Sequence, residues 1–521
     1  MKRGFIVVAA LLIWSALATV AVADDGPMYL VGNGGSVRPM KNTSIRMAAE
    51  TVQAICYSRF AEYKVDFRFE NAGTTETVLL GFPFNAPYYQ PPFTGGDTYL
   101  APAGFRAWQD GRPLAVALVH GQENYDDVDY YTHRAIFGPG ESTVTVDYLI
   151  SPSLGGGYSL KEMNYYRETL ITTIPPVYRP ELIAEGRYDY TLHTGSYWSG
   201  NIGTAVLRWT LSPDFIGWGV EQANAYHSRI DTSDPDPDMA PTEFDFAAAR
   251  IQSTYTTPAI GVYQWTLHDF SPKIWSDEDA SPYDLSLNFL APPLETQHGY
   301  ANQYRPPWAH ASSSLVLGPF AYPAASLVDG DPSTAWAEGA KGSGVGQWVG
   351  VSFPRTRTIR ELRILPGYAK RPELFSRYNR PKKLRFDFSD GTSLIVTLSD
   401  SPTLQRFLVA ATANKARMTI LSVYRGSVRN ETYVSEVEFG SAPAPTFEDP
   451  GVLLAAARDV PSADATPGAR SETTPTATAD ASAASPASAA DPSAAPPSPL
   501  AWAALALTLV AVTVTLVMTI L

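Results

Sequence analysis

Short runs of alternating apolar and polar residues limit most strongly how this chain can fold. Residues 63–70 read YKVDFRFE, with an apolar side chain at every second position. Because successive side chains of a strand point to opposite faces, this pattern predicts a half-buried β-strand. The same alternation recurs at 144–150 and 188–192, and further apolar runs lie at 78–84, 205–211 and 262–267.

The spacing of these runs predicts an all-β chain. Turn residues separate the runs, and no long amphipathic helical pattern precedes the C-terminal apolar tail. The 28 Tyr, 22 Phe, 38 Gly and 43 Pro residues also favour short strands and turns over helices. We therefore expect one or two β-sandwich units in residues 24–300, with a division near residue 151 at the loop-like segment SPSLGGG.

Charge and cysteine content narrow the class of protein. The net charge is −13 at pH 7 and no basic stripe is present, so nucleic acid is not expected as a partner. Cys56 is the single cysteine, which excludes a disulfide within the chain. We expect its thiol to be buried, with pairing between two chains as the alternative.

Both ends of the chain carry targeting signals. Residues 1–23 combine a basic start, an apolar run and the small-residue cleavage site Ala21-Val22-Ala23, which predicts a secretory signal peptide rather than a signal anchor. Residues 500–521 contain no charge and are long enough to span a bilayer as one helix. We expect a single-pass protein of the cell membrane with its folded part in the cell envelope or outside the cell. The alternative is a lipid-anchor signal, because small residues at 488–490 and a polar spacer precede the tail.

Residues 441–499 separate this tail from the folded part. Ala, Pro, Ser and Thr dominate the segment, and almost no large apolar residue follows Leu454. Such a composition cannot bury enough surface to offset the entropy of ordering. The sequence therefore predicts a disordered stalk that holds the folded part away from the membrane.

The segment 305–440 carries more specific motifs. DGDPSTAW at 329–336 is followed by a glycine-rich run, and alternating residues on either side of Asp390-Gly391 predict a β-hairpin. The remaining motifs are Gly367-Tyr368, NRPK at 379–382, VYRG at 423–426 and SEV at 435–437. In this order they resemble the discoidin-like, galactose-binding-type jelly roll, in its subtype called the NADase-type glycan-binding domain. The resemblance implies a jelly-roll β-sandwich that binds a glycan or another surface ligand.

The same resemblance implies a structural calcium ion at one end of the sandwich. Family members supply a carboxylate from the Asp-Gly-Asp loop, a Thr or Ser oxygen and a Glu of the last strand, all of them hard oxygen ligands that suit calcium. These correspond to Asp329, Thr334 and Glu436, with Asp331 adding a backbone oxygen. The alternative is that Asp329-Gly330 is only a turn and Glu436 only an exposed strand residue.

A ligand face is implied by aromatic and polar residues of the loops. Sugar-binding relatives stack loop aromatics on sugar rings and fix the hydroxyl groups with polar side chains. The alternative for each aromatic is ordinary packing, and Trp336 is expected in the core. The ligand-binding candidates are Tyr368, Tyr378, Asn379, Arg380 and Tyr424.

No catalytic motif stands out in the chain. There is no H-E-x-x-H, no G-x-S-x-G and no phosphate-binding loop. TGSYWSG at 194–200 and WTLHDFSP at 265–272 resemble an uncharacterised family of bacterial envelope β-domains, which implies no known activity. The acidic run at 231–238 lacks the Gly of an EF-hand loop and is expected to be a solvated loop.

These observations predict a membrane-anchored, non-enzymatic cell-surface protein whose discoidin-like domain binds a glycan or another surface ligand. Two alternatives stay open. In the first, residues 24–300 are an envelope enzyme acting on carbohydrate and the discoidin-like domain is a targeting module. In the second, the domain has a structural role and packs on residues 24–300 through an extensive interface.

Overall fold

The computed structural model describes most of the folded part of the chain. The predicted signal peptide, the part of the predicted stalk after residue 458 and the C-terminal apolar segment lie outside the described residues. Within them, none of the helices combines the length and the hydropathy that a bilayer span requires. The described residues are 26–31, 36–39, 44–84, 102–123, 126–159, 182–190, 192, 195, 197–215, 219–225, 252–259, 261–270, 285–291 and 308–458.

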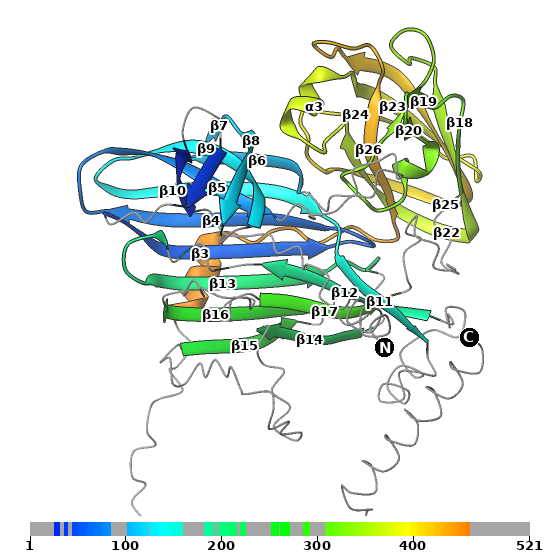
Figure 1. The fold of residues 1–521 in the computed structure, drawn as a ribbon. Coiled ribbons are helices and arrows are strands. Elements are labelled where there is room, and N and C mark those ends of the chain that lie inside the picture. Colours follow the sequence, from blue (N-terminus) through cyan, green and yellow to red (C-terminus); the bar gives the residue numbers. More distant parts are fainter. Residues whose placement is uncertain are drawn as a thin grey trace, which may run out of the picture. The chain divides into compact units, whose positions relative to one another are not determined.

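The fold is built almost entirely from strands, so the all-β prediction is confirmed (Figure 1). We call residues 26–291 the N-terminal region and residues 308–440 the C-terminal module. The N-terminal region contains β1 (Gly26–Val31), β2 (Ser36–Pro39), β3 (Ile45–Cys56), β4 (Ala61–Asn71), β5 (Glu76–Phe84), β6 (Ala103–Gln109), β7 (Arg112–Leu114), β8 (Ala117–Glu123), β9 (Asp126–Phe137), β10 (Gly140–Ile150), β11 (Ser153–Ser159), β12 (Leu182–Tyr190), β13 (Ile202–Leu211), β14 (Gly219–Ala225), β15 (Gln252–Ala259), β16 (Val262–Phe270) and β17 (Leu285–Ala291).

An eight-stranded sheet forms the centre of the N-terminal region, in the order β15-β16-β13-β3-β4-β10-β6-β7. Strand β13 pairs parallel to β3 from Thr204↔Ala49 to Leu211↔Cys56. The sheet thus takes strands from both sides of residue 151, and the expected division there is wrong because the hydrogen-bonded ladder crosses it. Two further sheets complete the region, one with the order β1-β2-β8-β9-β5 and one with the order β11-β12-β17-β14.

The alternating side chains of β4 explain the core of this region. Tyr63, Val65, Phe67 and Phe69 are all fully buried, while the charged residues between them lie on the other face. Their rings pack on other aromatics, as in the stacked pair Tyr63 and Tyr148 at 5.1 Å between centroids. The neighbouring Cys56 is also fully buried, and burial raises the pKa of its thiol. The expectation of a buried thiol is confirmed.

The C-terminal module has its own apolar core. It contains β18 (Trp308–Ala311), β19 (Leu315–Leu317), β20 (Phe320–Tyr322), η4 (Ala324–Leu327), β21 (Trp336–Ala337), β22 (Trp348–Pro366), α3 (Pro372–Arg377), β23 (Arg380–Phe388), β24 (Ser393–Thr397), β25 (Gln405–Tyr424) and β26 (Tyr433–Gly440). The main sheet has the order β21-β26-β22-β25-β23-β24, with β18 paired to β22. Trp336 is fully buried in the core as expected, and β23 and β24 form the predicted hairpin.

The chain returns to the N-terminal region after β26. Helix α4 (Pro450–Arg458) buries Leu453, Leu454 and Ala457 against β3 and β13. Just before it, the backbone of Glu448 exchanges two hydrogen bonds of 2.9 and 2.8 Å with the side chain of Gln53. Residues 441–458 are therefore not part of a disordered stalk, because this short apolar face and hydrogen bonds to Gln53, Arg363 and Arg406 hold the segment in place.

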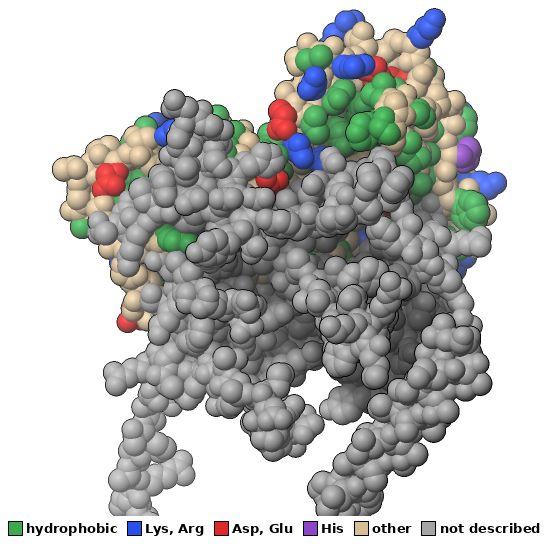
Figure 2. Space-filling view, viewed as in Figure 1, with side chains coloured by type: hydrophobic (Ala, Val, Ile, Leu, Met, Phe, Trp, Pro, Cys, Tyr) green, Lys and Arg blue, Asp and Glu red, His purple; other side chains and the backbone are tan. Residues whose placement is uncertain are grey.

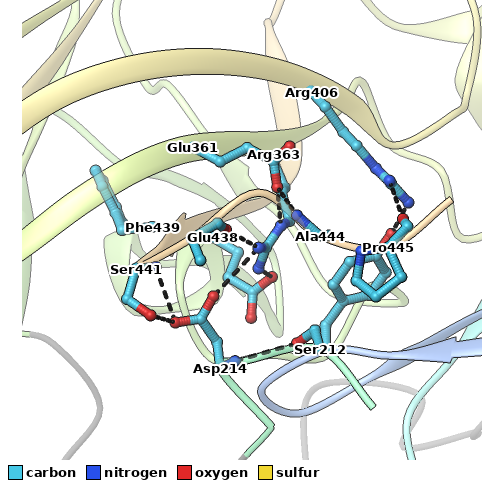
Figure 3. Close-up of polar contacts among 12 residues, drawn as sticks. Ser212, Asp214, Glu361, Arg363, Arg406, Glu438, Phe439, Ser441, Ala444 and Pro445 are labelled. Carbon is cyan, nitrogen blue, oxygen red and sulfur yellow. Dashed lines mark hydrogen bonds and ion pairs between the residues drawn. The ribbon is translucent and has the colours of Figure 1, made fainter. Parts of the chain in front are cut away.

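A buried arginine joins the module to the N-terminal region (Figure 3). Arg363 on β22 has a fully buried side chain. Its guanidinium donates to Glu361 at 2.6 Å and to Glu438 at 2.7 Å, both within the module. It also donates at 3.2 Å to Asp214, which follows β13 in the N-terminal region. Burial would lower the pKa of Arg363, but Glu438, Glu361 and Asp214 outweigh this and raise it above its usual range.

Apolar and backbone contacts surround this arginine. Tyr57 and Phe60 of the N-terminal region share a buried cluster with Leu365 and Leu404 of the module. The backbone N–H of Gly104 donates to Ala369 O at 2.7 Å, and that of Ser58 donates to Glu438 at 2.9 Å. We call this set of contacts, together with the arginine and its carboxylates, the junction. The junction is an extensive interface. Such an interface is what the alternative of a structural role for the discoidin-like domain required.

We predict that Arg363→Met lowers the free energy of unfolding of the full chain by about 3–5 kcal/mol, because Glu361 and Glu438 lose their cation and Asp214 keeps, among the described cations, only Arg357 at 3.7 Å. Guanidinium titration followed by tryptophan fluorescence measures the change. Arg385→Met is the control, since Arg385 is exposed and its ion pair with Asp387 is worth about 1 kcal/mol or less. Wild-type protein should unfold in one transition, and two separate transitions would contradict a stable junction.

Candidate functional sites of the C-terminal module

Four tyrosines gather at one side of the module. Tyr368 stacks on Tyr433 with 5.2 Å between the ring centroids, and the ring centroid of Tyr378 lies 4.4 Å from that of Tyr433. Tyr322 meets Tyr433 edge-on at 5.1 Å and Tyr368 at 5.8 Å. Tyr322, Tyr368 and Tyr378 stay partly exposed. We call these four residues the tyrosine cluster. Figure 2 shows hydrophobic side chains gathered near Lys and Arg side chains on the visible face of this module.

Glycine 367 explains how the cluster forms. Gly367 has a φ of 75°, a conformation that side chains disfavour. A Cβ at this position would lie 2.5 Å from Arg380 Cγ and 2.7 Å from the ring of Phe375. The Gly367 N–H donates to Tyr433 O at 3.1 Å, which ties the two chain segments together. Tyr368 is thereby placed directly against Tyr433.

Two buried oxygens of this site have no hydrogen-bond partner among the residues that the structure describes. They are the Tyr433 hydroxyl and Glu431 Oε2. Burial, and then the neighbouring tyrosines and Glu431, raise the pKa of Tyr433. A buried polar atom without a partner costs about 1–3 kcal/mol, so such atoms call for an explanation, such as a binding role.

The other ligand candidates have internal partners. Arg380 forms a bidentate ion pair with Asp400 at 2.8 and 2.7 Å and donates to the carbonyl of Tyr378 at 2.9 Å. Asn379 is fully buried, and its side chain accepts from Gly426 N–H at 2.7 Å. The Tyr424 hydroxyl donates to Leu398 O at 3.0 Å. In this structure these contacts order the loops beside the cluster.

The structure thus brings together two of the five candidates, Tyr368 and Tyr378. It adds Tyr322 and Tyr433, which the sequence analysis did not single out. Tyr433 stands two residues before the motif at 435–437, so that motif could have been extended to include it. Nothing in the sequence around Tyr322 distinguishes it from other aromatics.

The predicted calcium ligands lie around the hydroxyl of Thr334. Thr334 Oγ1 is 2.9 Å from Asp329 Oδ2, 3.1 Å from Asp331 O and 3.4 Å from Ser326 O. A hydroxyl has one proton and can donate to only one of these oxygens. Such an excess of oxygens fits a hard cation. Asp331 would contribute its carbonyl, as expected, because its carboxylate accepts from Ser333 at 2.7 Å instead.

Glu436 lies close to this oxygen group. Its Oε2 accepts from Gly330 N–H at 3.0 Å. Burial and the charge of Asp329 raise the pKa of Glu436, and burial and the charge of Asp331 raise the pKa of Asp329 to about 7. Across the junction, Arg59 donates to Asp329 O at 3.1 Å and supplies a positive charge beside the same loop.

The predicted calcium site is not built chiefly from carboxylates in the described residues. Among the described segments, no three His, Cys, Asp or Glu side chains converge as a metal centre. A calcium ion would depend on hydroxyl and carbonyl oxygens in addition to Asp329 and Glu436. The calcium site remains a prediction with a donor set that suits it.

The comparisons with known proteins concern this module. Residues 302–440 match the family described as the NAD glycohydrolase translocation F5/8 type C domain, which confirms the predicted discoidin-like resemblance. An alpha-(1->3)-arabinofuranosyltransferase of Mycobacterium tuberculosis is 37% identical over 111 residues, which is 20% of this chain and 8% of the transferase. The chain therefore spans only a small part of that curated relative.

Similar solved structures are carbohydrate-binding modules. The family 32 module of C. perfringens NanJ, solved with galactose, shares 18% identity, with 25% of this chain and 90% of that chain covered and a TM-score of 0.20. The family 32 module of Streptococcus pneumoniae EndoD shares 12% identity, with 26% and 97% covered and a TM-score of 0.22.

We predict that calcium raises the unfolding temperature of the full chain. At about 100 times its Kd, a ligand that binds only the folded state adds about 2.7 kcal/mol to the free energy of unfolding. Differential scanning calorimetry with calcium and with EGTA measures the shift.

The Asp329→Asn and Glu436→Gln variants should lose this response, because each removes a charged ligand. Asp331→Asn should keep it, because only the backbone carbonyl of that residue faces the site. Identical unfolding temperatures with calcium and with EGTA would show that Arg59 and the hydrogen bonds alone stabilise the loop.

Proposed function

We propose that this protein binds a glycan through the tyrosine cluster of its C-terminal module. The observation that carries the proposal is the group of four tyrosines beside two buried oxygens that lack partners among the described residues. The match of residues 302–440 to an F5/8 type C domain family supports it. The module would act without catalysis, as a recognition unit.

The chemistry of the cluster suits a sugar. Tyrosine rings bury the apolar C–H faces of a sugar ring, and each carries a polar hydroxyl at its edge. The Tyr433 hydroxyl and Glu431 Oε2 are closed to solvent in this structure, so they can bind the hydroxyl groups of the same sugar only once the partly exposed rings of Tyr322, Tyr368 and Tyr378 move aside. A ligand that supplies these hydrogen bonds removes the cost of leaving the two oxygens buried and unpaired.

The first glycans to test contain arabinofuranose. The M. tuberculosis relative that shares a 111-residue stretch with this chain is named as an arabinofuranosyltransferase. A recognition module in such an enzyme would hold an arabinofuranosyl chain near its site of synthesis. We propose the same ligand class here, with galactose-containing glycans as the comparison.

We also propose a location for this activity. A signal peptide at 1–23 and an apolar span at 500–521 would place the protein on the outer side of a cell membrane. The segment after residue 458 would act as a flexible tether. Binding by one module is expected to be weak, and many anchored copies would supply avidity.

A glycan array probed with the full chain tests the proposal. Tyr368→Ala removes a stacking ring and should weaken binding about tenfold or more. Tyr433→Phe removes only a hydroxyl that has no partner in the described part of the chain, so it should weaken binding while leaving the unfolding temperature equal or slightly higher. Leu408→Ala is the control, because Leu408 is 69% exposed and lies outside the cluster.

The Tyr433→Phe result separates binding from packing. If the Tyr433 hydroxyl does not contact the ligand, the Tyr433→Phe variant would gain stability and bind glycans as the wild type does. An array on which no glycan is bound by wild-type protein would contradict the proposal as a whole.

A structural role is the second candidate, and the junction favours it. Burial of Arg363 with Asp214 shows that the module packs extensively on the N-terminal region. This does not require the cluster to be covered, because the junction contacts use Leu365, Ala369 and Glu438 instead. Wild-type stability combined with lost binding in the tyrosine variants would separate the two roles.

A further inference from the structure

The main sheet of the module has one face that the glycan proposal does not use. Every second residue of β18, β22 and β25 enters the module core, among them Ala309, Val349, Val351, Ala416 and Met418. The residues between them point to the opposite face. We call this opposite face, formed across β18, β22, β25, β23 and β24, the outer face.

Strand register places the residues of the outer face in three adjacent rows. Trp308 pairs with Ser352, and Ser352 with Lys415. The complete rows are Trp308–Ser352–Lys415, His310–Gly350–Arg417–Asp387–Ser393 and Trp348–Thr419–Arg385–Ile395. Neighbouring strands lie about 4.8 Å apart, so the rows form a continuous surface.

This surface combines exposed aromatic and cationic groups. Trp308 is 62% exposed and Ile395 is 59% exposed. The Arg417 guanidinium lies 3.9 Å from the centroid of the Trp348 ring, and His310 meets the same ring edge-on at 5.3 Å. Exposed sheet faces are normally covered by polar residues, and aromatic side chains grouped with Arg are typical of binding surfaces.

Gly350 allows the imidazole ring of His310 to pack closely against the sheet. A Cβ at position 350 would lie 2.5 Å from Cε1 of His310. Only glycine therefore lets the His310 ring approach the backbone of β22 this closely beside Trp348. The arrangement of the three side chains is built into the sheet and does not depend on a loop.

The charge of the outer face is positive although the chain is acidic. Among the residues that the structure describes, Lys415 and Arg417 form no ion pair with a carboxylate, whereas Arg385 pairs with Asp387 at 2.8 Å. The chain as a whole carries −13, so attraction for an anion is confined to a local surface such as this one.

We propose that the outer face is a second binding surface, which takes a polysaccharide that bears carboxylate groups. The indoles of Trp308 and Trp348 contact the sugar rings, while Lys415 and Arg417 pair with the carboxylates. A chain lying across the rows contacts both kinds of group at once. None of the four cluster tyrosines lies in these rows, so the surface binds its ligand independently of the tyrosine cluster.

Biolayer interferometry with the immobilised full chain tests this proposal. Polygalacturonate is the probe, and neutral dextran is the comparison. We expect binding of polygalacturonate only, with an affinity that falls as salt is raised. Trp308→Ala and Arg417→Gln should each weaken it about tenfold or more. Val452→Ala, which trims a 60% exposed side chain on α4, should leave it unchanged.

The tyrosine variants distinguish this surface from the first site. Tyr433→Phe should leave polygalacturonate binding unchanged, whatever its effect on the glycan array. Unchanged affinity in Trp308→Ala would overturn the proposal, because charge alone would then explain binding. Binding of phosphatidylserine vesicles without binding of polygalacturonate would also overturn it and would identify a membrane surface instead.

Discussion

The burial of Arg363 governs how the described parts of this chain hold together. A guanidinium group without water needs carboxylates in contact, and removing any partner leaves a costly unpaired charge. Glu361 and Glu438 come from the module, whereas Asp214 comes from the N-terminal region. The shared charge makes the two parts mutually dependent, and the apolar contacts of Tyr57 and Leu365 exclude water around it.

Strand β26 connects this constraint to the candidate sites. Its end carries Glu438 at the junction, its middle carries Glu436 beside the loop of Asp329 and Gly330, and its start carries Tyr433 in the tyrosine cluster. All eight residues of β26 are buried. A rigid strand of this kind fixes the positions of the sites relative to the junction, so ligand binding should meet a preorganised surface.

The sequence predicted the parts of the fold that depend on local patterns. The alternation at 63–70 gave β4 and its core face, and Asp390-Gly391 gave the hairpin, because both signals lie within a few residues. Arg363 and Asp214 stand 149 residues apart, and no local pattern shows that such residues meet. The same limit applies to α4, whose two leucines dock only because β3 and β13 present Ala49 and Val206.

The candidate site was predictable only in part, for a similar reason. Tyr368 stood out through its motif with Gly367, and the structure shows that this glycine is what allows the stacking on Tyr433. Arg380 and Asn379 also stood out, but a motif can contain residues that order loops as well as residues that contact ligands. Whether a polar group faces solvent or an internal carbonyl is decided by tertiary packing, as the contacts of Arg380 illustrate.

Helix α4 has a mechanical consequence. Because the chain leaves the module and docks again on β3 and β13, tension applied beyond residue 458 would reach the N-terminal region before it reaches the module. The few apolar contacts of α4 would give way first and release residues 449–458, whereas residues 441–445 would stay bonded to Asp214, Arg363, Glu361 and Arg406. The helix would thus act as a sacrificial link that absorbs a pull on the chain before the force loads Arg363.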